Sequence, residues 1–156
     1  MNKKETVNAI EGLLGSQSTL TLCTADADGR PHAAPLFYWA GDDLQLFWFS
    51  SPASIHSRNI AFEPRAAVAV YVPTEDWKEI CGVQMRGVVS KVTDRALRRE
   101  VSRAYRDRFR LGNVFRVAIA KSALYRFCPE WIRYLDNTKH FGFKVEITIP
   151  PAVEQK

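Results

Sequence analysis

LTLCTADADGRPHAAPLFYWAGDDLQLFWFS, residues 20–50, is the stretch that decides the fold. Three apolar runs of strand length lie within it, at residues 20–25, 31–40 and 44–50. Such runs, bounded by Gly, Asp and Pro, are typical of β-strands. The two segments between them, Asp26–Gly29 and Gly41–Asp43, have turn composition, and Gly29 can adopt a positive φ at no steric cost. The stretch therefore predicts three strands joined as an antiparallel meander.

The rest of the chain adds more strands and a few short helices. Strands are expected at residues 65–72, 80–91, 124–128, 131–135 and 143–149, and helices at residues 3–14, 54–62 and 94–109. Residues 65–72 are apolar at every position after Arg65, which predicts a central strand that is buried on both faces. Residues 110–121 follow no clear period and are not assigned. Many short strands with helices at the corners indicate a mainly β (α+β) fold, an antiparallel barrel with short peripheral helices.

Length and composition indicate one globular domain over residues 1–156, with an N-terminal helix within residues 1–15 and a tail at residues 150–156. Hydrophobic residues make up 46% of the chain and charged residues 25%, which is globular composition. The polar N-terminus and the lack of a long apolar run predict a cytoplasmic protein without a membrane span. Cys23, Cys81 and Cys128 are odd in number and far apart, so we expect them to be buried apolar residues and not disulfides or metal ligands.

The net charge of +5 is concentrated in one segment. Residues 94–110 hold seven arginines and three acidic residues, a local charge of +4. A nucleic-acid surface would need aromatic side chains on the same face, whereas Tyr105 and Phe109 belong to the apolar stripe of the predicted basic helix, residues 94–109. We therefore expect a solvated helix face, and nucleic acid is not an expected partner.

No known catalytic motif is present. The sequence has no nucleophile elbow, no phosphate-binding glycine loop and no zinc-protease motif. His32, His56 and His140 are scattered, so no metal site is predicted. Any chemistry would have to come from a bound cofactor.

Several segments, taken in order, resemble a known family. They are DGRPHAAPLFYW (residues 28–39), FWFSS (47–51), SIHSRNI (54–60), EPRAAV (63–68), GVQMRG (82–87) and WIRYLDN (131–137). Their order and spacing are similar to those of the pyridoxamine 5′-phosphate oxidase-like family of FMN-binding split barrels, and closest to an uncharacterised branch of that superfamily. The resemblance covers about residues 10–149. It implies a split β-barrel that holds FMN near the interface of a homodimer.

The resemblance also implies which residues hold the cofactor. A phosphate needs cations and hydroxyl or backbone donors, which a helix N-terminus favours. The family pattern places FMN contacts on residues of the second strand, of the third strand and helix start, and of two later strands: Pro35, Leu36, Phe37, Tyr38, Phe49, Ser50, Ser51, Ser54, His56, Ser57, Arg58, Gln84 and Trp131. The backbone of Pro35 to Tyr38 would lie along the flavin ring, Gln84 would reach the ring, and Trp131 would wall the pocket from the other subunit.

The chain departs from the oxidases at positions that bear on its function. The oxidases carry a pair of basic residues in the second strand, where this chain is uncharged from Ala33 to Trp39. At the helix start the oxidases carry Ser-Arg-Lys, whereas this chain has Ser54-Ile55-His56. No arginine follows Arg133, so we do not expect pyridoxamine phosphate oxidation. A small FMN-dependent oxidoreductase of unknown substrate is the expected function, and its catalytic residues are not identified. The alternatives are a non-catalytic ligand-binding module, or the same fold with a deazaflavin (F420) or haem.

Overall fold

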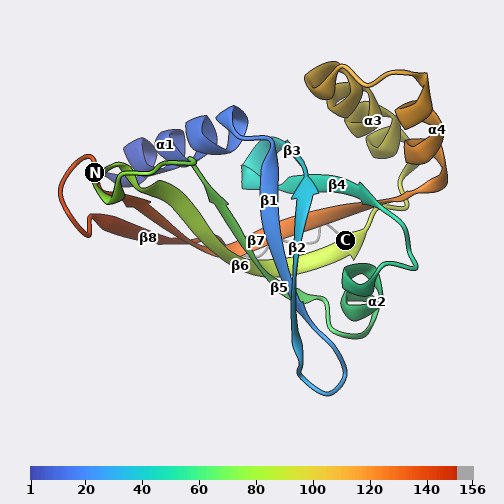
Figure 1. Cartoon of the computed structure of the whole chain (residues 1–156), viewed down its shortest axis with the longest axis horizontal. Helices are drawn as coiled ribbons and strands as arrows, with labels where there is room; N and C mark the ends of the chain where they lie inside the picture. The colour runs from blue at the N-terminus through green and yellow to red at the C-terminus, as the bar shows by residue number, and fades with distance from the viewer. Residues whose placement is uncertain (151–156) are drawn as a thin grey trace.

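A computed structural model describes residues 1–150 as one antiparallel sheet surrounded by helices (Figure 1). The elements are α1 (Lys3–Ser16), β1 (Thr19–Ala25), β2 (Pro31–Phe37), β3 (Trp39–Ala40), β4 (Leu46–Ser50), α2 (Ile55–Phe62), β5 (Arg65–Tyr71), β6 (Cys81–Lys91), α3 (Arg95–Phe109), α4 (Asn113–Lys121), β7 (Ala123–Asp136) and β8 (Lys144–Thr148), with short 3-10 turns at Asp42–Leu44 and Trp77–Glu79. Of the predicted tail, all but Pro150 lies outside the described residues.

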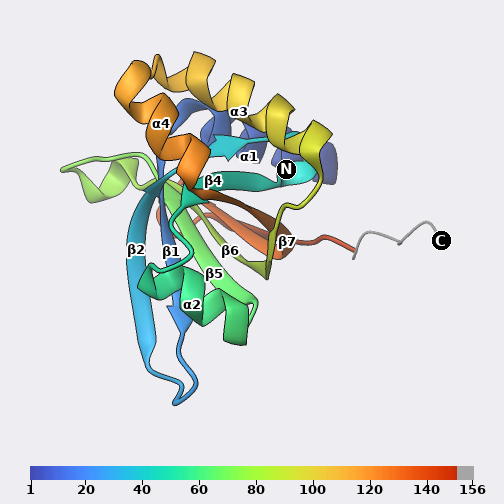
Figure 2. The ribbon, with the colours of Figure 1, turned by 90° about the vertical axis from the view of Figure 1, so that its right-hand side faces the viewer.

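The sheet is curled, and the first and last strands of its main order, β2 and β3, are consecutive in the chain. Neighbouring strands follow the order β2-β1-β5-β6-β7-β4-β3, with β8 paired to β7. Figure 2 shows β4 crossing over the strands β1, β5 and β6 as the sheet bends round on itself. Edge strand β2 contains Pro31 and Pro35, which have no N–H to donate and are tolerated at a sheet edge. The expected antiparallel barrel with peripheral helices is confirmed.

The meander predicted for residues 20–50 is confirmed in part: the strand predicted at residues 31–40 is divided into β2 and β3, which lie at opposite ends of the strand order, and β3 pairs with β4 across the predicted turn. β1 and β2 pair as expected, and Gly29 takes a φ of 77° in the turn between them. The third predicted strand, β4, pairs with β7 and β3 and not with β2. The reason is Tyr38, which is buried and donates its hydroxyl to the Leu14 carbonyl at 2.6 Å. This anchor ends β2 and directs the chain across to the opposite edge of the sheet.

The core fills the concave face of the curled sheet. Leu22, Val68, Met85 and Ile132 project into it from four neighbouring strands. Helix α1 begins with a capping box between Asn2 and Glu5 and adds Ile10, Leu13 and Leu14 to the core. Each such side chain contributes roughly 1.5–3 kcal/mol when it is fully buried.

The convex face of the sheet is exposed in the single chain, which corrects two expectations. β5 was expected to be buried on both faces, but only Val68 and Val70 are buried, while Ala67 and Ala69 on the other face are half-buried. Cys23 was expected in the interior and is exposed on this convex face. Successive strand residues alternate between faces, and Leu22 and Thr24 take the inward positions of β1.

A β-bulge fixes which side chains reach the convex face. The two strands predicted at residues 124–128 and 131–135 are one continuous strand, β7, whose register against β6 shifts between Arg86 and Gly87. A Cβ atom on Gly87 would lie 2.1 Å from the Cys128 carbonyl oxygen, so only glycine fits. Beyond the bulge, Trp131 pairs with Arg86 on the convex face, while Ile132 points into the core.

Helices α3 and α4 form a pair beside β3 and β4 (Figures 1 and 2). Val101 of α3 packs with Phe47 and Leu124 in a small second core. The unassigned residues 110–121 contain α4, in which Val114 and Val117 are exposed and Ile119 is buried. None of the helices within residues 1–150 is long and apolar enough to span a membrane.

Candidate functional site

Three serines and a histidine gather where β4 ends and α2 begins. Ser54 is the N-cap of α2 and accepts a hydrogen bond from the Ser57 backbone N–H at 3.3 Å. Its hydroxyl also donates to the Ser57 hydroxyl at 2.8 Å. The His56 Nε2 atom lies 2.6 Å from the Ser50 hydroxyl and 3.0 Å from that of Ser54. We call Ser50, Ser54, His56 and Ser57 the serine–histidine cluster.

The cluster is partly shielded from water and its histidine favours the neutral form. His56 and Ser57 are buried, and Ser50 and Ser54 are half-buried. Burial lowers the pKa of His56 below its ordinary value, and the neighbouring His32 lowers it further. The rings of His32 and His56 are stacked with their centroids 6.5 Å apart. The first turn of α2 carries no acidic residue, so no carboxylate there offsets the partial positive charge of the helix N-terminus, which favours an anion.

Helix α2 is held in place by the concave side of the sheet. The Asn59 side chain donates to the Thr24 hydroxyl at 3.1 Å, and both residues are buried. Sequence reasoning did not select Asn59, Thr24 or His32, although Asn59 and His32 lie within the segments 54–60 and 28–39 that resemble the family. Their contacts follow from α2 packing on β1 and β2, which a sequence pattern does not show.

Other predicted phosphate and ring contacts are placed differently. Ser51 and Arg58 are exposed, and each is joined to Ser54 only through backbone hydrogen bonds, from the Ser54 N–H to the Ser51 carbonyl at 3.1 Å and from the Arg58 N–H to the Ser54 carbonyl at 3.0 Å. Phe49 lies edge-on to Tyr105 of α3 at 5.3 Å and packs against the second core.

The edge strand β2 offers only part of the predicted flavin contact. Tyr38 is a core residue whose backbone N–H donates to the Ser18 carbonyl, and Leu36 packs against the core. Phe37 is exposed and its carbonyl accepts from the Tyr105 hydroxyl at 3.2 Å. Because backbone groups alternate in direction along an antiparallel pair, the groups that point away from β1 belong to Ala33, Pro35 and Phe37.

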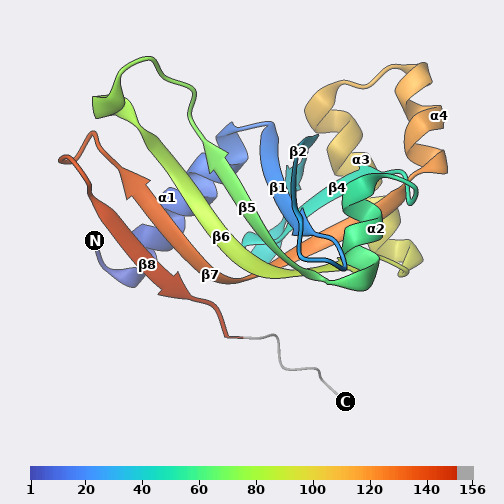
Figure 3. The ribbon, with the colours of Figure 1, turned by 60° about the horizontal axis from the view of Figure 1, so that its bottom comes forward.

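Gln84 and Trp131 lie together on the convex face, which Figure 3 shows as the strands β5, β6, β7 and β8 side by side. The guanidinium groups of Arg86 and Arg133 both lie over the Trp131 ring, at 4.2 Å and 5.2 Å from its centroid. Arg133 also donates to the Gln84 side chain at 3.4 Å and forms an ion pair with Glu146 at 2.7 Å, which holds the pKa of Glu146 below its usual value. Sequence reasoning missed Arg86 and Arg133 because the bulge sets their neighbours.

A shallow cavity of about 560 Å³ opens on this face between β1, β5, β6 and β7. Cys23, Ala67, Arg65, Arg86 and Trp131 are among its lining residues. The register aligns two rows of side chains across the face: Ala33, Cys23, Ala67, Arg86 and Trp131 in one, and Pro35, Thr21, Ala69, Gln84 and Arg133 in the other.

The predicted site residues thus fall into two groups on opposite faces of the sheet. The serine–histidine cluster adjoins Thr24 on the concave side, whereas Gln84 and Trp131 share the convex face with Cys23. No group of three or more metal-ligating side chains gathers within residues 1–150.

Comparison with known proteins decides the family. The family model described as pyridoxamine 5′-phosphate oxidase matches residues 6–136. The chain belongs to this oxidase family. The family resemblance inferred from residues 28–137 is therefore confirmed.

Relatives and solved structures agree with the oxidase-family assignment. A UPF0306 protein of Photorhabdus laumondii is 30% identical over 149 residues, which cover 93% of this chain and 97% of the relative. A pyridoxine/pyridoxamine 5′-phosphate oxidase of Pseudomonas paraeruginosa is 33% identical over 76 residues, 49% of this chain and only 34% of that enzyme. HutZ, the haem storage protein of Vibrio cholerae, superposes with a TM-score of 0.67 at 20% identity, covering 83% of this chain and 92% of HutZ. The fold is the split barrel of the oxidase family.

Proposed function

We propose that this chain is a homodimeric FMN-binding split-barrel protein that acts as a small oxidoreductase. The serine–histidine cluster carries the proposal, because it supplies hydroxyl donors and an imidazole within hydrogen-bond distance of one another at a helix N-terminus. This donor set fits a phosphate monoester, which is recognised by hydroxyls, cations and free backbone N–H groups. A bound flavin would supply the electron and hydride transfer that no side chain of this protein provides.

His56 would become protonated, and so positively charged, only when the anion is bound. In the unliganded protein, burial favours neutral His56. A phosphate beside Nε2 would favour the imidazolium and raise its pKa, so that binding is coupled to proton uptake. FMN affinity should therefore rise as the pH falls toward 6, whereas riboflavin affinity should not.

The division of the predicted site residues between two faces of the sheet supports the proposed second subunit. A partner chain that covers the convex face would bring its Gln84 and Trp131 toward a ligand held at the cluster of the first chain. The centre of that face carries small uncharged side chains, Ala33, Pro35, Thr21, Ala67 and Ala69, which suit a closely packed interface between sheets. Burial of the convex face in such an interface would also explain why β5 is apolar on both faces.

The test is a fluorescence titration of FMN and riboflavin against wild type and matched variants. Losing a charge-assisted hydrogen bond costs about 1.5–3 kcal/mol, so His56→Ala should weaken FMN by roughly tenfold to a hundredfold and leave riboflavin nearly unchanged. Ser50→Ala should do the same to a smaller degree, and His56→Lys should tighten FMN. Arg58→Ala tests whether this exposed arginine reaches the phosphate, with Arg30→Ala in the β1–β2 turn as the control. Equal affinity for both flavins would refute the phosphate site.

A haem or deazaflavin (F420) cofactor is the second candidate. The name of HutZ, a haem storage protein with the same fold, supports it, and the convex-face cavity contains one exposed thiol, Cys23, beside Arg86. A thiolate can ligate haem iron and arginines pair with carboxylates. The donor set of the serine–histidine cluster favours FMN, because the Nε2 atom of its histidine is already engaged by two hydroxyls. The absorption spectrum of the purified protein distinguishes the three cofactors, and a haem band lost in Cys23→Ser would replace the FMN proposal.

A further inference from the structure

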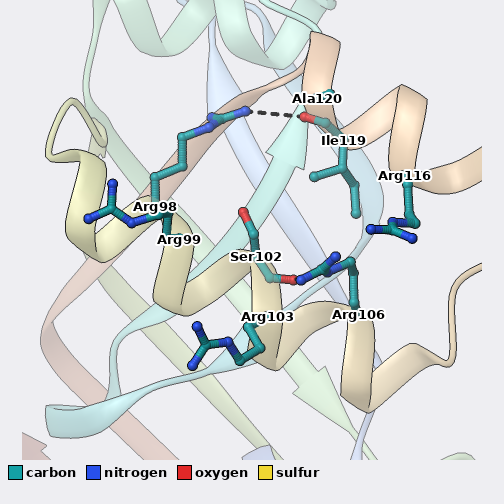
Figure 4. A pocket seen from close by; sticks show the side chains of 8 residues that line it. All are labelled: Arg98, Arg99, Ser102, Arg103, Arg106, Arg116, Ile119 and Ala120. Atoms are coloured by element: carbon teal, nitrogen blue, oxygen red, sulfur yellow. Dashed lines mark hydrogen bonds between the residues drawn. The ribbon is translucent and has the colours of Figure 1, made fainter.

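Helices α3 and α4 enclose a cleft lined by arginines, shown in Figure 4. The cleft has a volume of about 510 Å³, within the size range of small-molecule pockets. Five arginines line it: Arg98, Arg99, Arg103 and Arg106 from α3, and Arg116 from α4. Ile119 and Ala120 form an apolar part of its wall. The expected solvated face of the basic helix is therefore a concave surface that α4 completes.

Among the residues that the structure describes, the arginines of the cleft form no ion pair, although Arg99 and Arg103 also line a neighbouring hollow with Glu100 and Asp107. Within residues 1–150, none of these guanidinium groups lies within 4.0 Å of a carboxylate. The acidic residues of α3 do not line the cleft. Like charges three and four residues apart on a helix destabilise it, so this arrangement carries a cost that a bound anion would remove.

The arginines of the cleft differ in position: Arg106 and Arg116 extend into the space between the helices, whereas Arg99 and Arg103 project from α3 at its border (Figure 4). Arg98 donates to the carbonyls of Ile119 at 3.2 Å and Ser122 at 2.8 Å, which ties the C-terminal end of α4 to α3. Arg106 donates through Nε to the Ser102 carbonyl at 3.2 Å. Arg99, Arg103 and Arg116 are exposed, with their guanidinium groups available.

We propose that the α3–α4 cleft binds the diphosphate or triphosphate group of a small molecule. Guanidinium groups hold phosphate oxygens through paired N–H donors, and several of them around one cavity match an anion with several charges. A duplex would instead need a convex ridge or helix able to enter a groove, and the inward-facing arginines Arg106 and Arg116 lie within the cleft. The proposal is independent of the flavin site, because the cleft shares no residue with the serine–histidine cluster.

The experiment measures binding of inorganic triphosphate and of ATP by calorimetry at low salt. Wild type should bind both, and tighter binding of ATP would show that the nucleoside contacts the apolar wall. Arg103→Gln/Arg106→Gln should weaken binding by about tenfold for each guanidinium removed. The control Arg95→Gln/Lys121→Gln removes the same charge from the same helices outside the cleft and should keep most of the affinity. His56→Ala should leave triphosphate binding unchanged.

Arg116→Gln tests the contribution of α4 and should also weaken triphosphate binding. Circular dichroism checks that each variant is folded. Equal losses in the cleft and control variants would mean that only net charge matters and would overturn the proposal. So would wild-type binding weaker than about 1 mM. A duplex DNA that binds more tightly than triphosphate would assign the cleft to nucleic acid instead.

Discussion

Replacing Gly87 by alanine should disrupt the bulge that aims Trp131 at the convex face. The added Cβ would lie 2.1 Å from the Cys128 carbonyl oxygen and 2.9 Å from the Cys128 carbonyl carbon and the Pro129 Cα. All three atoms belong to the backbone of β7, so no rotamer change relieves the clash. Overpacking that side chains can absorb costs about 1–3 kcal/mol. We therefore expect Gly87→Ala to destabilise the protein by about 3 kcal/mol or more.

The control is Gly12→Ala in α1, where a Cβ meets nothing within 4 Å. Alanine is favoured over glycine inside a helix by about 0.5–1 kcal/mol, so this variant should be slightly more stable than wild type. For a domain of this size, a loss of 3 kcal/mol lowers the melting temperature by about 6–12 °C. Urea denaturation followed by circular dichroism measures both variants. A Gly87→Ala protein within about 0.5 kcal/mol of wild type would refute the close approach of the two strands.

Three further predictions concern the core, the histidine and the dimer. Tyr38→Phe should cost about 1–3 kcal/mol in urea denaturation, because it leaves the Leu14 carbonyl without its buried donor. The pKa of His56 is lower in the folded chain than in the unfolded chain, so the unfolded chain binds more protons and stability should fall as the pH drops below 6.5. In His56→Gln, the free energies of unfolding at pH 5.5 and pH 7.5 should differ less than they do in wild type. Sedimentation should show a wild-type dimer at micromolar concentration and an Ala67→Asp monomer, whereas a stable wild-type monomer would contradict the interface.

The positions of most strands could be predicted from the sequence because local patterns determine them. β1, β6 and α3 begin and end within a residue or so of their predicted bounds. Strand pairing was less accessible from the sequence, since the division of residues 31–40 into β2 and β3 brings together segments that are distant in the chain. Nothing within residues 31–40 shows that Tyr38 turns inward to Leu14, and without that contact a meander is the simplest interpretation.

The candidate site could be predicted in part. Ser50, Ser54, His56 and Ser57 lie within eight residues of sequence, and local helix capping brings them together. The residues that contact Trp131 could not be predicted from the sequence, because they depend on a register shift between two strands. α4 was not predicted because its apolar residues are divided: Val114 and Val117 are exposed, whereas Ile119 is buried.

The placement of α3 and α4 has an evolutionary consequence. Lys91 at the end of β6 pairs with Tyr125 of β7, and the Val92 N–H donates to the Leu124 carbonyl, so the two strands would meet even with a short turn between them. The helical pair is thus an insertion within a β-hairpin. Its arginine content can change without altering the pairing of any strand, provided that Val101 continues to cover Phe47. Related chains could therefore acquire, exchange or lose the specificity of this appendage while the barrel and its serine–histidine cluster stay the same.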